Sequence, residues 1–384
     1  MVKYRLLEIT ASYENYLDRF VEKNEDIDSL SYEELYSLLT EDCFAESDFI
    51  HRYLREIGIE SKVVFYNNVV LQRKWNEEFA NCGLFEILIK QIEDYEPDVI
   101  YVSDVTILSR EQLQHIRNYV DRKKAKLVGF CFFLPTAQNV MNVIELFDQI
   151  YTGAQYYVDL YYEKGIHVKL LRHAFEPSVY ERYASRHRVN DVVFLGNVFL
   201  GKDVHSNRVD MLKGLIDSGV SYSFYGGIYR GEDGRSILKK IKNHIYLNKE
   251  QRIINHIMDK KRQNNHPNIF GVDYYRTLSE HLVCVNCHIA AVGQGAGNMR
   301  MFEATGMGAC LLTDAKEENA MLFEVDKEIV TYSDMGEFQD KVKWLVENPA
   351  QAIKIAKAGQ KKTLQVHSYR NKALKLNEYL QELF

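Results

Sequence analysis

The sequence has little proline or tryptophan and no long apolar run. Of its 384 residues, only five are proline and two are tryptophan. No window approaches the roughly 18 uncharged apolar residues that a membrane-spanning helix needs. The scarcity of proline and the lack of any polar low-complexity run argue against a disordered chain. These absences predict a folded, globular protein without a transmembrane segment.

Basic residues are not in excess either. Lys and Arg number 48, Asp and Glu number 54, and the net charge is therefore −6. A protein whose main work is to hold a nucleic-acid backbone usually carries a basic excess. The charge balance therefore excludes nucleic acid as the expected partner, although it permits a local basic pocket.

The six cysteines lie mostly within apolar runs. The first nine residues include Glu8 and form too short an apolar stretch for a signal peptide. We therefore expect reduced thiols and a cytoplasmic protein. The run Cys284–His288 matches the pattern for covalent haem attachment, but it falls on a predicted buried strand and that chemistry needs export. No second paired cluster supports zinc, so no metal or cofactor is expected.

Short apolar runs alternate with helical patterns along the whole chain, which predicts an α/β fold with mainly parallel sheets. The length suggests two or three domains. The expected strands of the first half are 4–9, 62–66, 98–103, 126–131, 149–152 and 168–171, with helices such as 83–95 and 110–124 between them. Those of the second half are 191–195, 221–225, 282–286, 309–313 and 328–331, with helices at 208–218 and 337–347.

The polar stretch 180–190 separates the two halves and is interpreted as a linker. We predict two Rossmann-like, doubly wound domains, residues 1–185 and 186–366, with a cleft between them. The stretch 367–384 is predicted to form a helix that packs back on the first domain. Ligands of such sheets bind at the carboxyl ends of the strands.

The densest candidate site runs from Cys287 to Asp314 as strand, glycine-rich loop, helix and strand. Gly293, Gly295 and Gly297 allow close approach of the backbone to a ligand, and Asn298 can cap the helix that follows. The amides of such a helix start, including that of Met299, suit a phosphate or diphosphate. Arg300 adds guanidinium donors, and Glu303 offers a carboxylate to ribose hydroxyls. The alternative is a flexible loop followed by a solvated charge pair.

Two further strand ends supply candidate donor-binding residues. Gly196 and Asn197 form the first turn of the second domain, where Lys202 and Arg208 bring positive charge. Tyr225 and Gly226 end the next strand, where a simple turn is the alternative. His288 follows the strand at 282–286, and either a core position or contact with substrate fits its place.

Strand ends of the first domain supply three candidates for proton transfer. Asp104 follows the strand at 98–103, and a general base or a cap of the next segment fits it. His173 and Glu176 follow the strand at 168–171, where the apolar flanks also fit a structural histidine. No Walker-type loop, zinc-protease motif or G-x-G-x-x-G dinucleotide fingerprint occurs.

The segment Asn298–Asp314 resembles the R-x-F-E-A-x-x-x-G-A-x-x-L-T-D segment of the CgeB-like glycosyltransferases, a GT-B-fold family named for a spore-maturation protein. Val193–Gly196, Tyr222–Gly226 and His367–Tyr369 are similar to further stretches of that family. The resemblance implies sugar transfer from a nucleotide-diphosphate sugar to a glycan or glycoconjugate acceptor, without a metal. Glu303 would bind the donor ribose, and the second domain would hold the diphosphate.

The resemblance also implies a role in the synthesis of a bacterial surface glycan. Many retaining GT-B enzymes carry a second glutamate eight positions before the one matched by Glu303, where this chain has Gly295. The stereochemistry of transfer therefore stays open. A nucleotide-sugar epimerase of the same fold and a non-catalytic nucleotide- or glycan-binding module are the alternatives.

Overall fold

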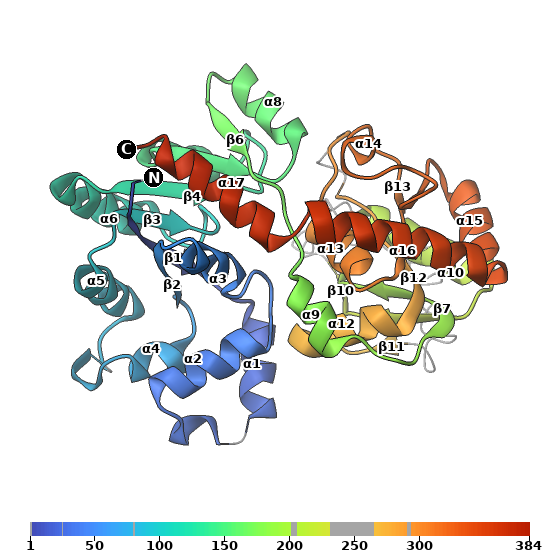
Figure 1. Ribbon diagram of the computed structural model, residues 1–384, viewed down its shortest axis with the longest axis horizontal. Coiled ribbons are helices and arrows are strands. Elements are labelled where there is room, and N and C mark those ends of the chain that lie inside the picture. Colours follow the sequence, from blue (N-terminus) through green and yellow to red (C-terminus); the bar gives the residue numbers. More distant parts are fainter. Residues whose placement is uncertain (1, 25, 80, 201–205, 231–264, 290–292) are drawn as a thin grey trace, which may run out of the picture. The chain divides into compact units, whose positions relative to one another are not determined.

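The computed structural model describes residues 2–24, 26–79, 81–200, 206–230, 265–289 and 293–384. The chain divides into two compact units (Figure 1). The first contains Met1–Glu176 together with Ser368–Phe384, and the second contains Pro177–His367.

The first unit is built on a parallel six-stranded sheet in the order β2-β1-β3-β4-β5-β6. Parallel neighbours need a crossover, and helices provide it between most of these strands. The strands are β1 Arg5–Thr10, β2 Glu60–Phe65, β3 Val99–Val102, β4 Lys126–Phe130, β5 Gln149–Thr152 and β6 Val168–Leu170. The helices are α1 Glu14–Lys23, α2 Tyr32–Glu41, α3 Phe49–Glu56, α4 Val69–Lys74, α5 Leu84–Tyr95, α6 Arg110–Lys123, α7 Gln138–Met141, α8 Gln155–Glu163 and α17 Tyr369–Gln381.

Both ends of the chain take part in the first unit. The Val2 amide donates to Gln381 Oε1 at 2.7 Å, and Gln381 Nε2 donates to the Val2 carbonyl at 2.8 Å. The Tyr4 ring stacks on Phe384 with centroids 5.7 Å apart. Helix α17 packs against α3, and its Tyr369 amide donates to the Phe175 carbonyl at 3.0 Å.

The second unit repeats the plan with a parallel six-stranded sheet in the order β11-β9-β7-β12-β13-β14 and a two-stranded sheet of β8 and β10. The strands are β7 Val189–Leu195, β8 Val198–Leu200, β9 Tyr222–Tyr225, β10 Ile228–Arg230, β11 Asn265–His266, β12 His281–Val285, β13 Cys310–Asp314 and β14 Val330–Tyr332. The helices are α9 Pro177–Tyr183, α10 Ser206–Ser218, α12 Gly271–Glu280, α13 Met299–Gly306, α14 Asn319–Leu322, α15 Met335–Glu347 and α16 Pro349–Val366.

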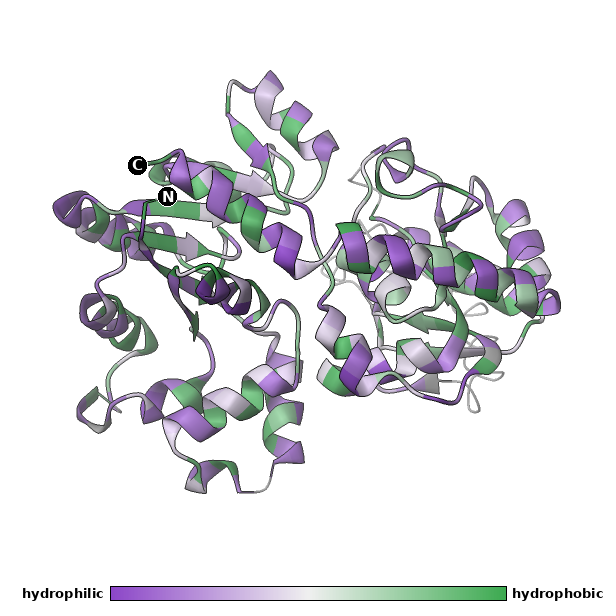
Figure 2. Cartoon of the chain, in the orientation of Figure 1, coloured by the Kyte–Doolittle hydropathy of each residue, from purple (hydrophilic) through white to green (hydrophobic). Residues whose placement is uncertain are grey.

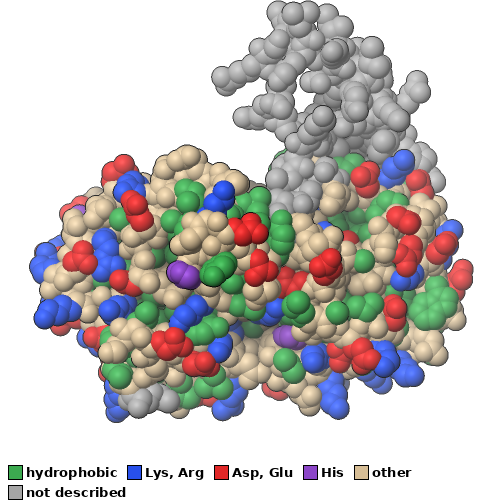
Figure 3. Space-filling view, turned by 90° about the horizontal axis from the view of Figure 1, so that it is seen from above, with side chains coloured by type: hydrophobic (Ala, Val, Ile, Leu, Met, Phe, Trp, Pro, Cys, Tyr) green, Lys and Arg blue, Asp and Glu red, His purple; other side chains and the backbone are tan. Residues whose placement is uncertain are grey.

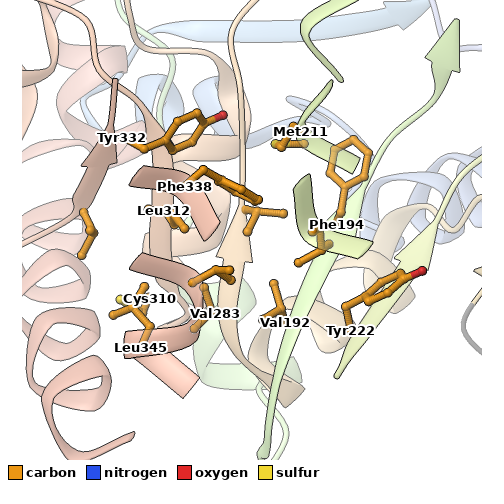
Figure 4. Close-up of a cluster of buried hydrophobic side chains, with 14 of the residues drawn as sticks. Val192, Phe194, Met211, Tyr222, Val283, Cys310, Leu312, Tyr332, Phe338 and Leu345 are labelled. Atoms are coloured by element: carbon orange, nitrogen blue, oxygen red, sulfur yellow. The ribbon is translucent and has the colours of Figure 1, made fainter. Parts of the chain in front are cut away.

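Apolar residues of the central strands and one stripe of each covering helix form the core of the second unit (Figure 4). Val192 and Phe194 of β7 and Val283 of β12 meet Met211 of α10 and Phe338 of α15 there, each at most 1% exposed. Figure 2 shows the matching pattern on α16, where polar and apolar residues alternate around the helix. Burial of these stripes fixes the strand ends that carry the candidate site.

The prediction of two parallel-sheet α/β domains is confirmed. The linker interpretation of residues 180–190 is wrong in part, because α9 continues to Tyr183 and β7 begins at Val189. The division falls after Glu176, not after residue 185, since α9 packs on α12 of the second unit. Strands β8, β10 and β11, two or three residues long, are absent from the prediction because such runs carry almost no periodicity.

No helix in the described ranges is long and apolar enough to cross a membrane. Acidic and basic side chains are interspersed on the face shown in Figure 3. None of the six cysteines forms a disulfide, and all but Cys82 are buried.

Candidate functional site

Two turns interlock at the carboxyl ends of β7 and β9. The Gly196 amide donates to the Tyr225 carbonyl at 2.8 Å, and the Gly227 amide donates to Asn197 Oδ1 at 3.0 Å. A Cβ on Gly226 would lie 2.2 Å from the Gly196 carbonyl oxygen, so only glycine fits there. The Tyr225 ring stacks on His266, and Tyr225 contributes its backbone carbonyl to these turns.

Two guanidinium groups converge on Gly196. A Cβ built on this glycine would lie 3.3 Å from Arg300 Nη1 and 3.7 Å from Arg208 Nη1. Arg208 Nη1 donates to the Asn197 carbonyl at 3.0 Å, which fixes its place. Gly196 therefore brings its backbone close to two positive charges, in a conformation with φ of +140° that favours glycine. Lys202, which the sequence analysis adds to this turn, lies outside the described residues.

Helix α13 begins beside this turn with a fixed N-cap. Asn298 Oδ1 accepts from the Met301 amide at 3.3 Å, and the Asn298 side chain exchanges hydrogen bonds with Asn286 at 3.2 and 3.3 Å. The backbone N–H groups of Met299 and Arg300 have no acceptor in the described part of the chain. Unpaired amides at a helix start are donors suited to an anion.

The glycine-rich loop before α13 is held by protein groups. The Gly297 amide donates to His288 Nε2 at 3.3 Å, the Ala296 amide donates to Glu318 Oε2 at 3.1 Å, and Lys316 Nζ donates to the Gly293 carbonyl at 2.7 Å. The Gly297 amide is thus occupied here, and the donors open to a ligand lie at Met299 and Arg300.

His288 is a buried support of this loop. Since Nε2 accepts from Gly297, the ring proton sits on Nδ1, which donates to Asp314 Oδ1 at 2.7 Å. Burial alone would raise the pKa of Asp314, but the hydrogen bonds from His288 bring that pKa below its ordinary value. Only 2% of the His288 surface is exposed.

Glu303 and Arg300 meet at a tyrosine that the sequence analysis does not single out. The Tyr274 hydroxyl donates to Glu303 Oε2 at 2.7 Å and accepts from Arg300 Nε at 3.0 Å. Burial raises the pKa of Glu303, whereas Arg300 and Tyr274 act in the opposite direction. Glu303 Oε1 makes no hydrogen bond within the described residues and so remains available to a ligand hydroxyl. Tyr274 lies 26 positions before Arg300, and no local motif links them.

The three candidates of the first unit lie in different settings. Asp104 Oδ1 accepts from the amide and the hydroxyl of Thr106 at 2.8 and 2.7 Å, so it caps its own turn. Glu176 is buried and accepts from the Tyr53 hydroxyl at 3.1 Å. His173 is buried, its Nδ1 lies 3.6 Å from Glu46 Oε1, and its ring stacks on Phe132 with centroids 5.2 Å apart.

Glu46 joins His173 to the C-terminal helix, and sequence reasoning missed it. Its Oε1 accepts from Lys372 Nζ at 2.5 Å. Cys43, Ala45 and Ser47 around it have φ values of 59°, 52° and 46°, a left-handed conformation that costs roughly 1–2 kcal/mol at each non-glycine residue. The only signal in the sequence is an acidic residue in a short segment between two helices.

The residues that the structure describes contain no cluster of three or more His, Cys, Asp or Glu side chains placed to hold a metal ion. The positive charge of the candidate site comes from Arg208 and Arg300 instead.

Comparison with known proteins identifies the architecture. Residues 235–378 match a family model described as glycosyl transferase-like. The whole chain is similar in structure to HepE of Anabaena, solved with UDP and glucose, at a TM-score of 0.56 and 12% identity over 98% of this chain and 99% of that one. The fold is GT-B.

Other GT-B structures resemble the chain to a similar degree. Sucrose-phosphate synthase of Thermosynechococcus elongatus has a TM-score of 0.54 at 10% identity over 99% of both chains. A glycosyltransferase of Rickettsia africae has a TM-score of 0.53 at 12% identity over 100% of this chain and 99% of that one. None of the curated proteins matches the chain in sequence.

Proposed function

We propose that this GT-B chain is a glycosyltransferase that moves a sugar from a nucleotide-diphosphate sugar to a hydroxyl of a glycan or glycoconjugate. One observation carries the proposal: the guanidinium groups of Arg300 and Arg208 converge on the Gly196 turn, next to the open amides of Met299 and Arg300. Like charges placed together are unfavourable until an anion joins them, and a diphosphate matches two guanidiniums and a helix start.

In this proposal, the second unit binds the donor. Arg300, Arg208 and the α13 amides hold the diphosphate and stabilise the negative charge that develops on it as the bond to the anomeric carbon breaks. Glu303 Oε1 accepts from the ribose hydroxyls. Gly196, Asn197, Gly226 and Gly297 shape the turns, and His288 and Asn298 fix the loop and the helix cap.

The acceptor proton needs a base, and His173 is the strongest of the three candidates. Its Nδ1 faces the Glu46 carboxylate, which favours a proton on that nitrogen and leaves Nε2 as the acceptor. In the proposed step, Nε2 takes the proton of the acceptor hydroxyl, the oxygen bonds to the anomeric carbon, and the nucleoside diphosphate leaves. We assign Asp104 to the cap of its own turn and Glu176 to the hydrogen bond with Tyr53.

We further propose that the reaction needs no metal, because two arginines and a helix start supply the charge that a divalent cation gives elsewhere. Full activity in EDTA is the expected result, and loss of activity that Mg²⁺ restores would contradict this part. The CgeB-like subtype and the link to surface glycans are also proposals, which rest on the motifs at Asn298–Asp314. A cytoplasmic location is a proposal that rests on the six free cysteines.

The test is calorimetric titration with UDP, GDP, ADP, CDP and dTDP. UDP is the first choice, because HepE was solved with it. At least one diphosphate should bind, and Arg300→Ala should weaken it at least about tenfold, the loss typical of a charged hydrogen bond. Arg276→Ala is the control, since Arg276 is half exposed and its one ion pair among the described residues is with Asp273 in its own helix.

Turnover of the matching sugar nucleotides against a panel of glycan acceptors completes the test. Product that forms only with acceptor supports the transferase. Conversion of the donor without acceptor would identify an epimerase, and tight binding without any turnover would identify a binding module. Failure of all five diphosphates to bind would overturn the proposal.

A further inference from the structure

The Tyr274 hydroxyl bridges two charged side chains of the candidate site. It stands in α12, and its hydroxyl lies between two charged groups of α13, 3.0 Å from Arg300 Nε and 2.7 Å from Glu303 Oε2. The Arg300 guanidinium carbon also lies 5.8 Å from the centre of the tyrosine ring. A phenol has one proton to donate and lone pairs to accept, so this one group satisfies both charges.

The Tyr274 hydroxyl engages Arg300 Nε and Glu303 Oε2, which leaves the Nη atoms of Arg300 and Oε1 of Glu303 for a ligand. Arg300 and Glu303 are three positions apart on one helix, where oppositely charged side chains commonly pair directly. Here Arg300 makes no ion pair within the described residues, and its Nη1 atom points toward Gly196. Glu303 likewise gives one oxygen to Tyr274 and keeps Oε1 unengaged within that part of the chain.

The surroundings of Tyr274 keep its hydroxyl protonated, so that it can donate a hydrogen bond. Burial raises its pKa well above the ordinary value of a tyrosine; the Arg300 guanidinium acts to lower this pKa and the Glu303 carboxylate to raise it, and the effect of burial prevails. The hydroxyl therefore stays protonated and continues to donate to Glu303. The bridge is thus a permanent part of the site.

We propose that Tyr274 is a positioning residue that couples the diphosphate-binding guanidinium of Arg300 to the ribose-binding carboxylate of Glu303. The inference rests on the proposed function. Its distinguishing consequence is that the tyrosine hydroxyl, which contacts no ligand, sets how strongly the protein discriminates nucleotides by their ribose hydroxyls.

The experiment compares wild type and Tyr274→Phe by calorimetric titration with UDP, 2′,3′-dideoxy-UDP and inorganic pyrophosphate. Wild type should prefer UDP over the dideoxy compound by about tenfold or more, the cost of lost hydrogen bonds to a charged group. In Tyr274→Phe, the UDP affinity should fall about tenfold, the preference should shrink below about threefold, and pyrophosphate should bind more weakly. Tyr222→Phe is the control, because the Tyr222 hydroxyl makes no hydrogen bond within the described residues of the same unit.

A double-mutant cycle with Glu303→Gln separates a specific coupling between the two residues from a general loss of structure. If the two residues act together, Tyr274→Phe should cost less than about threefold in UDP affinity once Glu303 is replaced. Unchanged binding in Tyr274→Phe, an equal loss for UDP and the dideoxy compound, or additive effects in the cycle would overturn the coupling role. Failure of wild type to bind both UDP and pyrophosphate would instead count against the proposed donor site.

Discussion

Glu46 Oε1 lies 2.5 Å from Lys372 Nζ, although 326 positions separate the two residues. Lys372 is almost completely buried, and its ammonium group also lies 5.4 Å from the centre of the Phe130 ring. The pair fastens the C-terminal helix to the strained segment that contains Cys43, Ala45 and Ser47. Because the ammonium is desolvated, the strength of this attachment depends on both partners being present.

Lys372→Met should therefore destabilise the protein by about 3–5 kcal/mol, because it leaves the Glu46 carboxylate buried without its cation. Denaturant unfolding followed by circular dichroism measures the change. The matched control is Lys375→Met, three positions along the same helix, since the Lys375 side chain is 43% exposed, pairs with Glu378 and lies over the Tyr379 ring. The double variant Glu46→Leu with Lys372→Met should be more stable than Lys372→Met alone; further loss in the double variant would contradict the account.

The Glu46 carboxylate should also make the free energy of unfolding depend on pH in the acid range. Burial alone would raise the pKa of Glu46, but Lys372 and His173 lower it to about 2 from the ordinary 4.5. A carboxyl whose pKa is depressed by folding contributes stability above its unfolded value, and this contribution is lost as the pH falls toward the folded value. The free energy of unfolding should thus fall more steeply between pH 4.5 and 2 in wild type than in Glu46→Gln. Parallel curves for the two proteins would refute the assignment.

Gly196→Ala should weaken diphosphate binding by placing a methyl group 3.3 Å from Arg300 Nη1, where the anion is proposed to sit. The φ of +140° adds backbone strain of the order of 1–3 kcal/mol. Titration with pyrophosphate measures the first effect, and we expect a loss of at least about tenfold. Gly219→Ala controls for strain, because Gly219 has a φ of +74° but open space around its Cβ position. Equal affinities of the two variants would remove the anion from this turn.

His288→Leu should loosen the glycine-rich loop, because the Gly297 amide loses its acceptor and Asp314 loses its donor. Each buried group left unsatisfied costs about 1–3 kcal/mol. Hydrogen exchange should accelerate in the peptide that contains Gly297 and stay unchanged in peptides of the first unit. His115→Leu is the control, an exposed histidine of α6. Unchanged exchange at Gly297 in His288→Leu would show that the loop does not depend on this bond.

The sequence predicts the frame of the fold well, and local physics explains why. Helix α6 follows a capping box of Ser109 and Gln112, and α5 ends just before Pro97, both of which are visible as short-range patterns. The strands from β1 to β6 are apolar runs between such signals. The turns around Gly196 and Gly226 are also predictable, because glycine marks positions where backbones approach closely.

The contacts within the candidate site are less accessible to such reasoning. Tyr274 joins Arg300 and Glu303 only because α12 packs beside α13, and tyrosine in a helix fits a core position equally well. Glu46 reaches Lys372 from the opposite end of the chain. These partners are chosen by tertiary packing, which no short-range pattern records.

The pairing of Val2 with Gln381 has a consequence for biosynthesis. The first unit needs the last residues of the chain, including Lys372 and the Phe384 ring, before its sheet and helices are completely covered. A ribosome synthesises α17 after the whole of the second unit, so the second unit can finish folding while the first still waits for that helix. Nascent chains arrested before Ser368 should accordingly expose an unfinished amino-terminal half to chaperones.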